Sequence, residues 1–295
     1  MRVTIIALSL TLSACLHSRK DPTGCGPIRV CSFNIMQFGL HAEDRDLDAL
    51  ADATRACDAL FLQEVRVDGD LQQVHRLAKR LDAKATISDE AGHGEGYAVL
   101  TRRGVRASAF QPIDALQGFA RRPALVHLEA GELDALVVSV HLSWKNTKRR
   151  AQENLRLLRW MLEEHDDPDV MILGDFNRYG NGGKTFHVWT EAAQAGAVRV
   201  LLEETTTRPS ARRARSDPRS TTVGRSRWQY DQIIVSPAFS HELAAQPVRF
   251  GTNVGVVPFD RAPALDALSH PVLSRRMSDH RPVWVRLCTN RRDDD

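Results

Sequence analysis

The sequence lacks several features that would narrow its function at once. Its first hydrophobic run, over residues 3–12, is shorter than the roughly 20 residues that a membrane-spanning helix needs. The spacing of the five cysteines matches no zinc-binding pattern. The formal net charge of +3 over 295 residues is too mild to indicate a partner. The composition is that of an ordinary globular protein, and with no internal repeat and no dividing linker we expect one domain over residues 28–288.

The N-terminal segment has the pattern of an export signal, because Arg2 precedes the short apolar run. The run ends at Leu12-Ser13-Ala14-Cys15, which resembles the lipobox of bacterial lipoproteins. That resemblance implies a signal peptide over residues 1–14, a lipid on Cys15 as membrane anchor, a tether over residues 15–27 and a place in the bacterial cell envelope. The alternative is an ordinary signal peptide cut after Ala14.

An exported chain meets an oxidising compartment, so the remaining cysteines could form disulfides. Cys31 and Cys57 lie within or just before apolar strand-like runs, and we expect them to be small core residues instead.

Cys25 and Cys288 differ from that pair in their distance from two polar residues. Cys25 is nine positions before Asn34, and Cys288 is eight positions after His280. If Asn34 and His280 share a site on antiparallel strands, both cysteines lie at the opposite end of those strands. We therefore predict a Cys25–Cys288 disulfide.

Hydrophobic periodicity predicts an α/β protein in which strands form two sheets with helices outside, a sandwich. Helical spacing is seen over residues 47–54, 71–81, 148–164 and, in a shorter form, 186–193. Strand-like runs cover residues 28–35, 59–65, 97–101, 105–110, 124–128, 133–142, 170–174, 229–236, 248–250 and 281–287. We expect residues 289–295 to be a disordered tail.

Residues 204–227 interrupt this pattern with seven arginines among Ser, Thr and Pro. They are Arg208, Arg212, Arg213, Arg215, Arg219, Arg225 and Arg227. The segment has almost nothing apolar to bury, which predicts a mobile loop. A solvated charge run is the usual explanation, but this one leads directly into Trp228-Gln229-Tyr230-Asp231, which favours a position facing the substrate.

Polar residues follow the apolar runs repeatedly. The run over residues 170–173 stops at Gly174 and delivers Asp175 and Asn177, a pattern that a simple turn would also show. The same pattern recurs at Asn34, Glu64, His141, Asp231, Asp279 and His280. A soluble protein rarely places so many ionisable groups beside apolar strands without a metal or a reaction, so we expect one site.

The order of these residues resembles the endonuclease/exonuclease/phosphatase superfamily, nearest its secreted deoxyribonuclease I-like branch, over residues 28–287. The segments that carry the resemblance are Phe33-Asn34-Ile35-x-x-Phe38-Gly39, Glu95-x-Tyr97, Arg121-x-Pro123-Ala124, Tyr230-Asp231-x-Ile233 and Ser278-Asp279-His280-x-Pro282. The resemblance implies a two-sheet sandwich flanked by helices, and metal-dependent phosphodiester hydrolysis.

Phosphodiester hydrolysis requires a cation, a base for water and an acid for the leaving oxygen. Carboxylate oxygens suit Mg²⁺, or alternatively Mn²⁺ or Ca²⁺, better than zinc. The resemblance implies that the His280–Asp231 pair activates water and that the His141–Glu95 pair protonates the leaving group. The predicted site comprises the catalytic residues His141, His280, Asp231, Asp175 and Glu95, the metal ligands Glu64, Asp279 and Asn34, and the phosphate contacts Asn177 and Arg121.

The function that these expectations favour is an exported, monomeric nuclease with little sequence preference, acting on DNA or RNA. Met36 and His93 stand where the deoxyribonuclease I-like branch carries an arginine and an aromatic residue for the minor groove, which puts duplex DNA in doubt. A phospholipid or inositol-phosphate hydrolase is the alternative within the superfamily. A catalytically silent binding lipoprotein is the alternative from another class, although the complete residue set argues against it.

Overall fold

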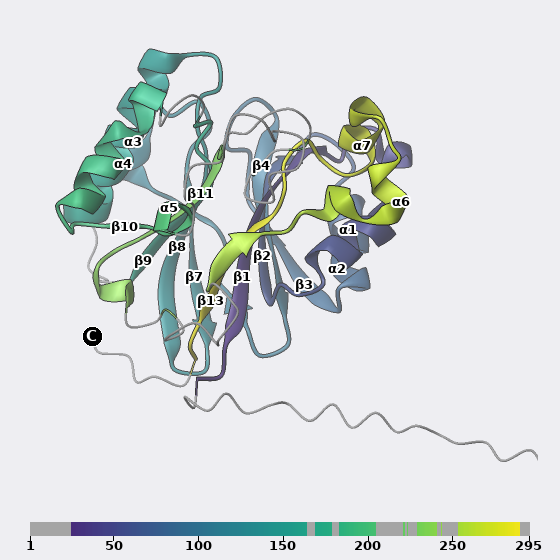
Figure 1. Ribbon diagram of the computed structural model, residues 1–295, viewed down its shortest axis with the longest axis horizontal. Coiled ribbons are helices and arrows are strands. Elements are labelled where there is room, and N and C mark those ends of the chain that lie inside the picture. The colour runs from purple at the N-terminus through teal and green to yellow at the C-terminus, as the bar shows by residue number, and fades with distance from the viewer. Residues whose placement is uncertain are drawn as a thin grey trace, which may run out of the picture.

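The computed structural model describes residues 25–163, 169–178, 183–204, 229–240 and 253–289, with residues 221, 223 and 243. These residues form two mixed β-sheets packed face to face with helices on both outer sides (Figure 1). The predicted α/β sandwich is therefore confirmed. The expectations for the signal peptide, Cys15, most of the tether, the C-terminal tail beyond Thr289 and the seven arginines fall outside the described residues.

Each sheet has a defined strand order. The first sheet runs β12 (Val254–Val256), β13 (Val283–Leu287), β1 (Ile28–Phe38), β2 (Ala59–Arg66), β4 (Glu95–Arg102), β3 (Ala83–Ile87). The second sheet runs β10 (Arg199–Val200), β11 (Asp231–Val235), β9 (Val170–Asp175), β8 (Leu133–His141), β7 (Ala124–Ala130), β5 (Arg106–Ala107), and β6 (Gln111–Pro112) also pairs with β7.

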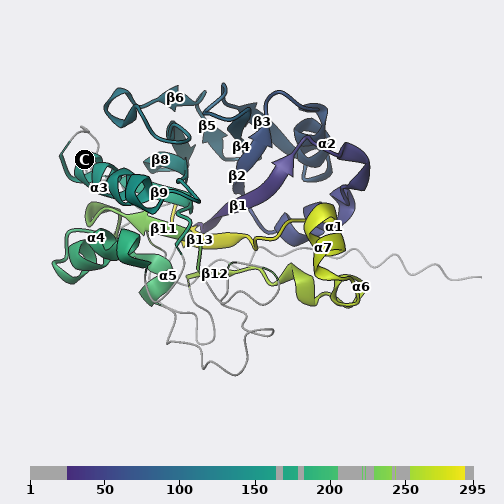
Figure 2. The same ribbon diagram turned by 90° about the horizontal axis from the view of Figure 1, so that it is seen from above.

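Most of the helices lie in the two outer layers, whereas Leu201 and Leu202 of α5 pack into the central layer. The α-helices are α1 (Leu47–Thr54), α2 (Gln72–Arg80), α3 (Thr147–Glu163), α4 (Gly183–Gln194), α5 (Leu201–Glu204), α6 (Pro263–Asp266) and α7 (His270–Arg276). Short 3₁₀ turns are η1 (Ala42–Asp44), η2 (Asp114–Leu116), η3 (Ala238–Ser240) and η4 (Phe259–Arg261). Figure 2 shows α3 and α4 on one side of the molecule and α1, α2 and α7 on the other. Among the described residues, no helix is both long and apolar enough to span a membrane.

Three apolar layers follow from the alternation of side chains along the strands. The central layer lies between the sheets and joins residues such as Phe61 of β2 to Met171 of β9. Leu60, the neighbour of Phe61, points the other way, into the layer under α1 and α2. Ile172 likewise turns outward into the layer under α3 and α4, which contains the fully buried Trp189. Strands buried on both faces explain the continuous apolar runs in the sequence.

Strand directions bring the polar strand ends together. β1 and β2 are parallel and are connected through α1, and β8 and β9 are parallel and are connected through α3. β13 is antiparallel to β1, β4 to β2, and β11 to β9, so these three strands begin at the edge where the parallel pairs end. The carboxyl ends of four strands and the amino ends of three others therefore meet along one edge of the sandwich.

Two disulfides lie within the described residues. Cys25 and Cys288 are joined with a Cα–Cα distance of 5.0 Å, which confirms the predicted bond. Cys31 and Cys57 are also joined, with a Cα–Cα distance of 5.8 Å, so the expectation that they are unpaired core residues was wrong. The cause is the register of β1 and β2, because Val30 lies opposite Ala59 and this places Cys57 beside the start of β1.

The structure also corrects the strand predicted over residues 105–110. Only Arg106–Ala107 pairs with β7 there, and a second short strand begins at Gln111. Between them the hydroxyl of Ser108 accepts the backbone N–H of His127 at 3.0 Å, so a side chain takes the place of a ladder carbonyl. The strand expected over residues 248–250 falls outside the described part of the chain, which does contain β12 a few residues later.

Candidate active site

Three predicted site residues lie in one row across the second sheet. Asp175, the last residue of β9, is opposite His141 on β8 and opposite Asp231 on β11. Gly174 makes this approach possible, because its φ is +139° and a Cβ at this position would lie 2.1 Å from the carbonyl oxygen of Val140. A glycine is therefore required where β9 passes β8, directly before the central carboxylate.

The first sheet contributes Asn34 and Glu64 at an interruption of its register. The pairing of β1 with β2 shifts after Asn34, and the pairing of β2 with β4 shifts after Leu62. Glu64 has a φ of +58°, which a non-glycine residue rarely adopts. Such bulges re-aim a side chain at the end of a strand, and here they direct the Glu64 carboxylate toward the second sheet.

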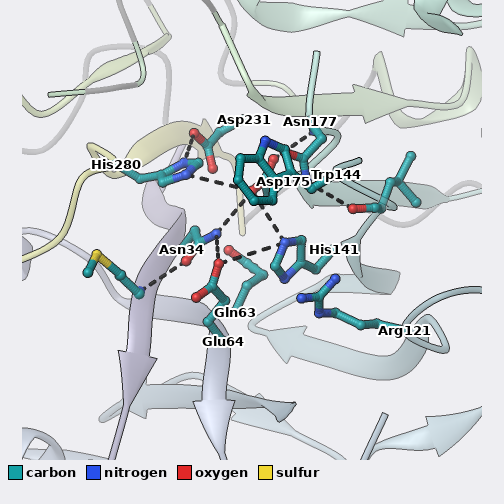
Figure 3. A network of polar contacts seen from close by, with 12 residues as sticks. Asn34, Gln63, Glu64, Arg121, His141, Trp144, Asp175, Asn177, Asp231 and His280 are labelled. Carbon is teal, nitrogen blue, oxygen red and sulfur yellow. Dashed lines mark hydrogen bonds and ion pairs between the residues drawn. The ribbon is translucent and has the colours of Figure 1, made fainter. Parts of the chain in front are cut away.

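Asn34 links the two sheets. Its side-chain Nδ2 donates to Oε1 of Glu64 at 2.9 Å and to Oδ2 of Asp175 at 3.0 Å, while its Oδ1 accepts the backbone N–H of Met36 at 3.0 Å (Figure 3). Asn34 is fully buried. In this arrangement the amide orients two carboxylates, and the predicted role of Asn34 as a metal ligand stays a prediction.

His280 and Asp231 form a direct imidazole–carboxylate contact at this edge. Nδ1 of His280 lies 2.8 Å from Oδ2 of Asp231, and Nε2 of His280 lies 3.7 Å from Oδ2 of Asp175. Ser278 holds this segment, because its hydroxyl donates to the carbonyl of Asn34 at 2.7 Å and accepts the backbone N–H of His280 at 3.0 Å. The sequence-predicted pairing of this imidazole with a carboxylate is present.

Burial and charge act against each other in this group. Burial raises the pKa of Asp231 to about 6, and the charge of His280 offsets only part of the effect. Burial lowers the pKa of His280, but Asp231 and Asp175 outweigh it and hold that pKa well above 6.5. Burial also raises the pKa of Asp175, but His280 and His141 outweigh it and hold the value below 3.8. The two carboxylates therefore favour the protonated form of His280.

His141 lies between carboxylates from both sheets. Its Nε2 is 3.6 Å from Oδ2 of Asp175 and 3.8 Å from Oε1 of Glu64, and its Nδ1 is 3.5 Å from Oε2 of Glu95. The predicted neighbourhood of His141 and Glu95 is present, at ion-pair distance. Arg121 binds both oxygens of Glu95, so in this structure its guanidinium pairs with a carboxylate. Its proposed phosphate contact remains a prediction.

The ionised form of the Glu95 carboxyl is strongly favoured over the neutral form. Burial raises the pKa of this carboxyl, but hydrogen bonding and charge from His141 and Arg121 outweigh burial and lower the value to about 2. Glu95 is therefore ionised throughout the physiological pH range.

Gln37 is a residue of this site that sequence reasoning missed. Its side-chain Nε2 donates to Oε2 of Glu64 at 3.0 Å and to Oε1 of Glu95 at 2.9 Å. Its backbone N–H also donates to Oε2 of Glu64 at 3.0 Å. The available signal was its place three residues after Asn34, next to Met36 near the end of β1.

Asn177 and Asp279 complete the predicted set. The backbone N–H of Asn177 donates to Oδ1 of Asp175 at 2.7 Å, and its Nδ2 donates to the carbonyl of Leu142 at 2.8 Å. Asp279 is more open, with 45% of its side chain exposed and its Oδ1 4.0 Å from Nε2 of His280. The structure thus brings all ten predicted catalytic, metal and phosphate residues to one edge of the sandwich.

The donor set at this edge fits a hard divalent cation. Single donor atoms of Asp175, Asp231 and His280 lie within 4.8 Å of one another, and Oδ1 of Asp231 is buried without a hydrogen-bond partner. Glu64 and Asp279 add further carboxylate oxygens, which suit Mg²⁺.

Comparison with known proteins gives a family match and several structural neighbours. A model described as the endonuclease/exonuclease/phosphatase family matches residues 31–280. TDP2 of D. rerio, solved in complex with a single strand DNA product, has a TM-score of 0.60 at 19% identity, covering 89% of this chain and 99% of that one. The mannosyl-6-phosphatase of Bacteroides thetaiotaomicron has a TM-score of 0.59 at 16% identity, covering 88% and 99%. An endonuclease/exonuclease/phosphatase family protein of the same species has a TM-score of 0.58 at 17% identity, covering 88% and 94%. No curated protein matches the sequence.

Proposed function

This chain belongs to the endonuclease/exonuclease/phosphatase family, and we propose that it is an exported, metal-dependent phosphodiesterase that hydrolyses DNA or RNA with little sequence specificity. Members of the family are phosphoester hydrolases, and the fold agrees with that assignment. The nuclease activity, the export and the cation are the parts that we propose here.

The observation that carries the proposal is the row of Asp231, Asp175 and His141 facing Asn34 and Glu64 of the other sheet. Two imidazoles each lie beside a buried carboxylate, on either side of Asp175. A phosphodiester placed over Asp175 would have one imidazole toward the attacking water and the other toward the leaving oxygen. This arrangement suits displacement at phosphorus.

Each residue has a defined part in this proposal. His280, oriented by Asp231, accepts a proton from water in its neutral form, after the imidazolium has lost its own proton, and His141, held by Glu95, delivers one to the leaving oxygen. Asn177 and Arg121 contact the phosphate. Glu64, Asp279 and Asn34 would hold a divalent cation, which when bound offsets charge on the phosphoryl oxygens.

Nucleic acid is favoured over other phosphodiesters by the seven arginines of residues 204–227, which precede Asp231 in the sequence. A polyanion releases counterions when arginines neutralise its phosphates, and this adds affinity that does not depend on sequence. A small phosphate ester would make little use of such a segment.

A phosphomonoester or phospholipid substrate is the second candidate. The fold similarity to a mannosyl-6-phosphatase motivates it, and the same pairs of imidazole and carboxylate would serve. A sphingomyelin-type substrate would call for an exposed apolar hairpin, which the sequence does not indicate.

Export is supported by the two disulfides, which are typical of an oxidising compartment. Together with the lipobox-like sequence, they favour a lipid-anchored protein of the bacterial cell envelope. Labelling with a radioactive fatty acid tests the anchor, and a Cys15→Ser variant that keeps the label would contradict it.

The substrate assignment is tested by one panel of assays. Plasmid DNA, single-stranded DNA, RNA, phospholipid vesicles and a sugar phosphate are incubated side by side with Mg²⁺ and with EDTA. We expect cleavage of nucleic acid only with Mg²⁺. Release of phosphate from the sugar phosphate, or of headgroups from the vesicles, without nucleic-acid cleavage would overturn the nuclease proposal and leave the family assignment standing.

A further inference from the structure

Trp144 is unusually exposed for a tryptophan. Within the described part of the chain, three large hydrophobic side chains are exposed, and Trp144 is the only aromatic one, at 58% exposure. Leu155 and Leu162, the other two, lie on α3. A single exposed hydrophobic residue is ordinary on a protein surface, so its surroundings must decide whether it has a role.

Trp144 stands at the edge of the candidate active site. It is three residues beyond His141, the last residue of β8. Hydrogen bonds hold the chain after His141 against residues of the site. The backbone N–H of Leu142 donates to the carbonyl of Asp175 at 2.9 Å, and Asn177 donates to the carbonyl of Leu142 at 2.8 Å. Figure 3 shows the indole among the side chains drawn at this edge.

Buried charges of α3 fix the backbone that carries this ring. Arg150, which is 2% exposed, donates to the carbonyl of Ser143 at 2.8 Å and also to the carbonyl of Trp144. Glu153 accepts the backbone N–H of Ser143 at 2.8 Å and, with its other oxygen, the backbone N–H of Ala120 at 2.7 Å. One carboxylate therefore ties the Trp144 segment to the loop that leads into Arg121. Buried charges are costly unless they are well bonded, and here their bonds hold two segments of the site in place.

The ammonium group of Lys145 lies over one face of the indole, so a base would stack on the opposite face, and the group adds a second element of recognition. Nζ of Lys145 lies 5.1 Å from the centroid of the indole. An aromatic face offers stacking to any nucleobase, and an adjacent ammonium group offers charge to the neighbouring phosphate. A base inside a duplex is already stacked on its neighbours, so a fixed indole suits an unpaired base.

We propose that Trp144, with Lys145, forms a stacking subsite for an unpaired nucleobase next to the scissile phosphate, so that the substrate is single-stranded or frayed nucleic acid. This inference rests on the proposed nuclease function and deepens it. Trp144 acts in binding and specificity, and it takes no part in proton transfer.

Matched substrates and variants test the subsite. A single-stranded oligonucleotide is compared with an abasic oligonucleotide of the same length, which keeps the phosphates and lacks the bases. Trp144→Ala should raise the KM for the base-bearing strand about 5-fold to 150-fold, the range that corresponds to the loss of one stacked base, and leave the KM for the abasic strand unchanged. Trp144→Phe should restore most of the difference, and Leu162→Ala, which removes an exposed side chain elsewhere, should change neither KM.

A binding measurement separates recognition from catalysis. In EDTA, which stops turnover, the Kd of each strand is measured by fluorescence anisotropy, and Trp144→Ala should weaken only the binding of the base-bearing strand. Equal effects on both strands, or none on either, would overturn the subsite while leaving the nuclease function intact. If the wild-type protein cleaves neither strand with Mg²⁺, the nuclease proposal fails, and the subsite fails with it.

Discussion

Backbone conformation at single residues shapes this site. Met36, Gln37, Glu64 and Asn177 have φ values between 48° and 58°, although none of them is glycine. Each such residue costs roughly 1 to 3 kcal/mol unless its surroundings compensate, and such residues concentrate at functional sites. The backbone N–H groups of Gln37 and Asn177 donate to the side chains of Glu64 and Asp175, and these hydrogen bonds offset part of that cost.

Gln37 provides the first prediction at this scale. Gln37→Met keeps the size of the side chain and removes the donor shared by Glu64 and Glu95. Hydrogen bonds to charged groups contribute about 1.5 to 3 kcal/mol, so we expect kcat to fall about 10-fold to 100-fold with the fold retained. Steady-state kinetics with thermal melting measures both, and Gln72→Met, an exposed glutamine on α2, is the control. An unchanged kcat would show that the bridge has no role in positioning.

The titration of His280 provides the second prediction. Asp231 is the nearest charge that raises the pKa of this imidazole, so Asp231→Asn should move its titration to lower pH. Because the folded-state pKa of His280 lies above its unfolded value of 6.5, the stability that this imidazole contributes is fully present below pH 6.5 and is lost as pH rises through the folded-state pKa. NMR titration of the metal-free protein measures the shift, and an unmoved His280 resonance would contradict the ion pair.

The strand and helix elements were predicted best where their apolar runs are long. The runs at β1, β2, β8 and β9 and the periodicity of α3 indicated the elements that carry most of the site. The strand β3 was missed because its residues Ala83–Ile87 alternate weakly, and only its pairing with β4 orders it. The helices α6 and α7 are each one or two turns long, too short for a periodic signal.

Gln37 was missed because its role depends on two carboxylates from different strands.

The Cys31–Cys57 bond is an element-scale prediction, because it joins β1 to the segment between α1 and β2. Its loop spans 26 residues, and in the chain-entropy model such a loop contributes about 3 to 4 kcal/mol. The double variant Cys31→Ala and Cys57→Ala should therefore lower the free energy of unfolding by about that amount in chemical denaturation. Cys25→Ala with Cys288→Ala is the companion variant, and its longer loop of 263 residues should make the loss larger. Two free thiols at Cys31 and Cys57 in the oxidised protein would contradict the bond.

At the scale of the whole molecule, a sandwich of two sheets brings strand ends that are far apart in the sequence to one edge. Asn34 and Asp175 are 141 residues apart and share a hydrogen bond. The order of polar strand ends along the sequence could indicate this edge, because it resembles a known family. The hydrogen-bond partners of these residues could not be predicted from the sequence, because they depend on the register and the bulges of β1 and β2.

Salt dependence is a prediction for the whole molecule, because it concerns the seven arginines between Glu204 and Trp228. Replacing these arginines with serine at constant length should raise KM at moderate salt and flatten the dependence of log affinity on log salt by about 0.9 per lost contact on duplex, or about 0.7 on single strands. The kcat at saturation should change little, because no proposed catalytic group lies there. An unaltered slope would show that the segment does not contact the substrate.

The rate of phosphodiester hydrolysis by His280→Ala and Asp175→Ala tests the central claim most directly. Both variants and the wild-type protein are assayed with Mg²⁺ and with EDTA on a single-stranded oligonucleotide, and His75→Ala, an exposed histidine of α2, is the matched control. We expect the wild-type protein and His75→Ala to be active only with Mg²⁺, and the two site variants to lose about 10²-fold or more in kcat while remaining folded. Near wild-type turnover in folded His280→Ala or Asp175→Ala, with Mg²⁺ present, would contradict the assignment of this edge as the active site.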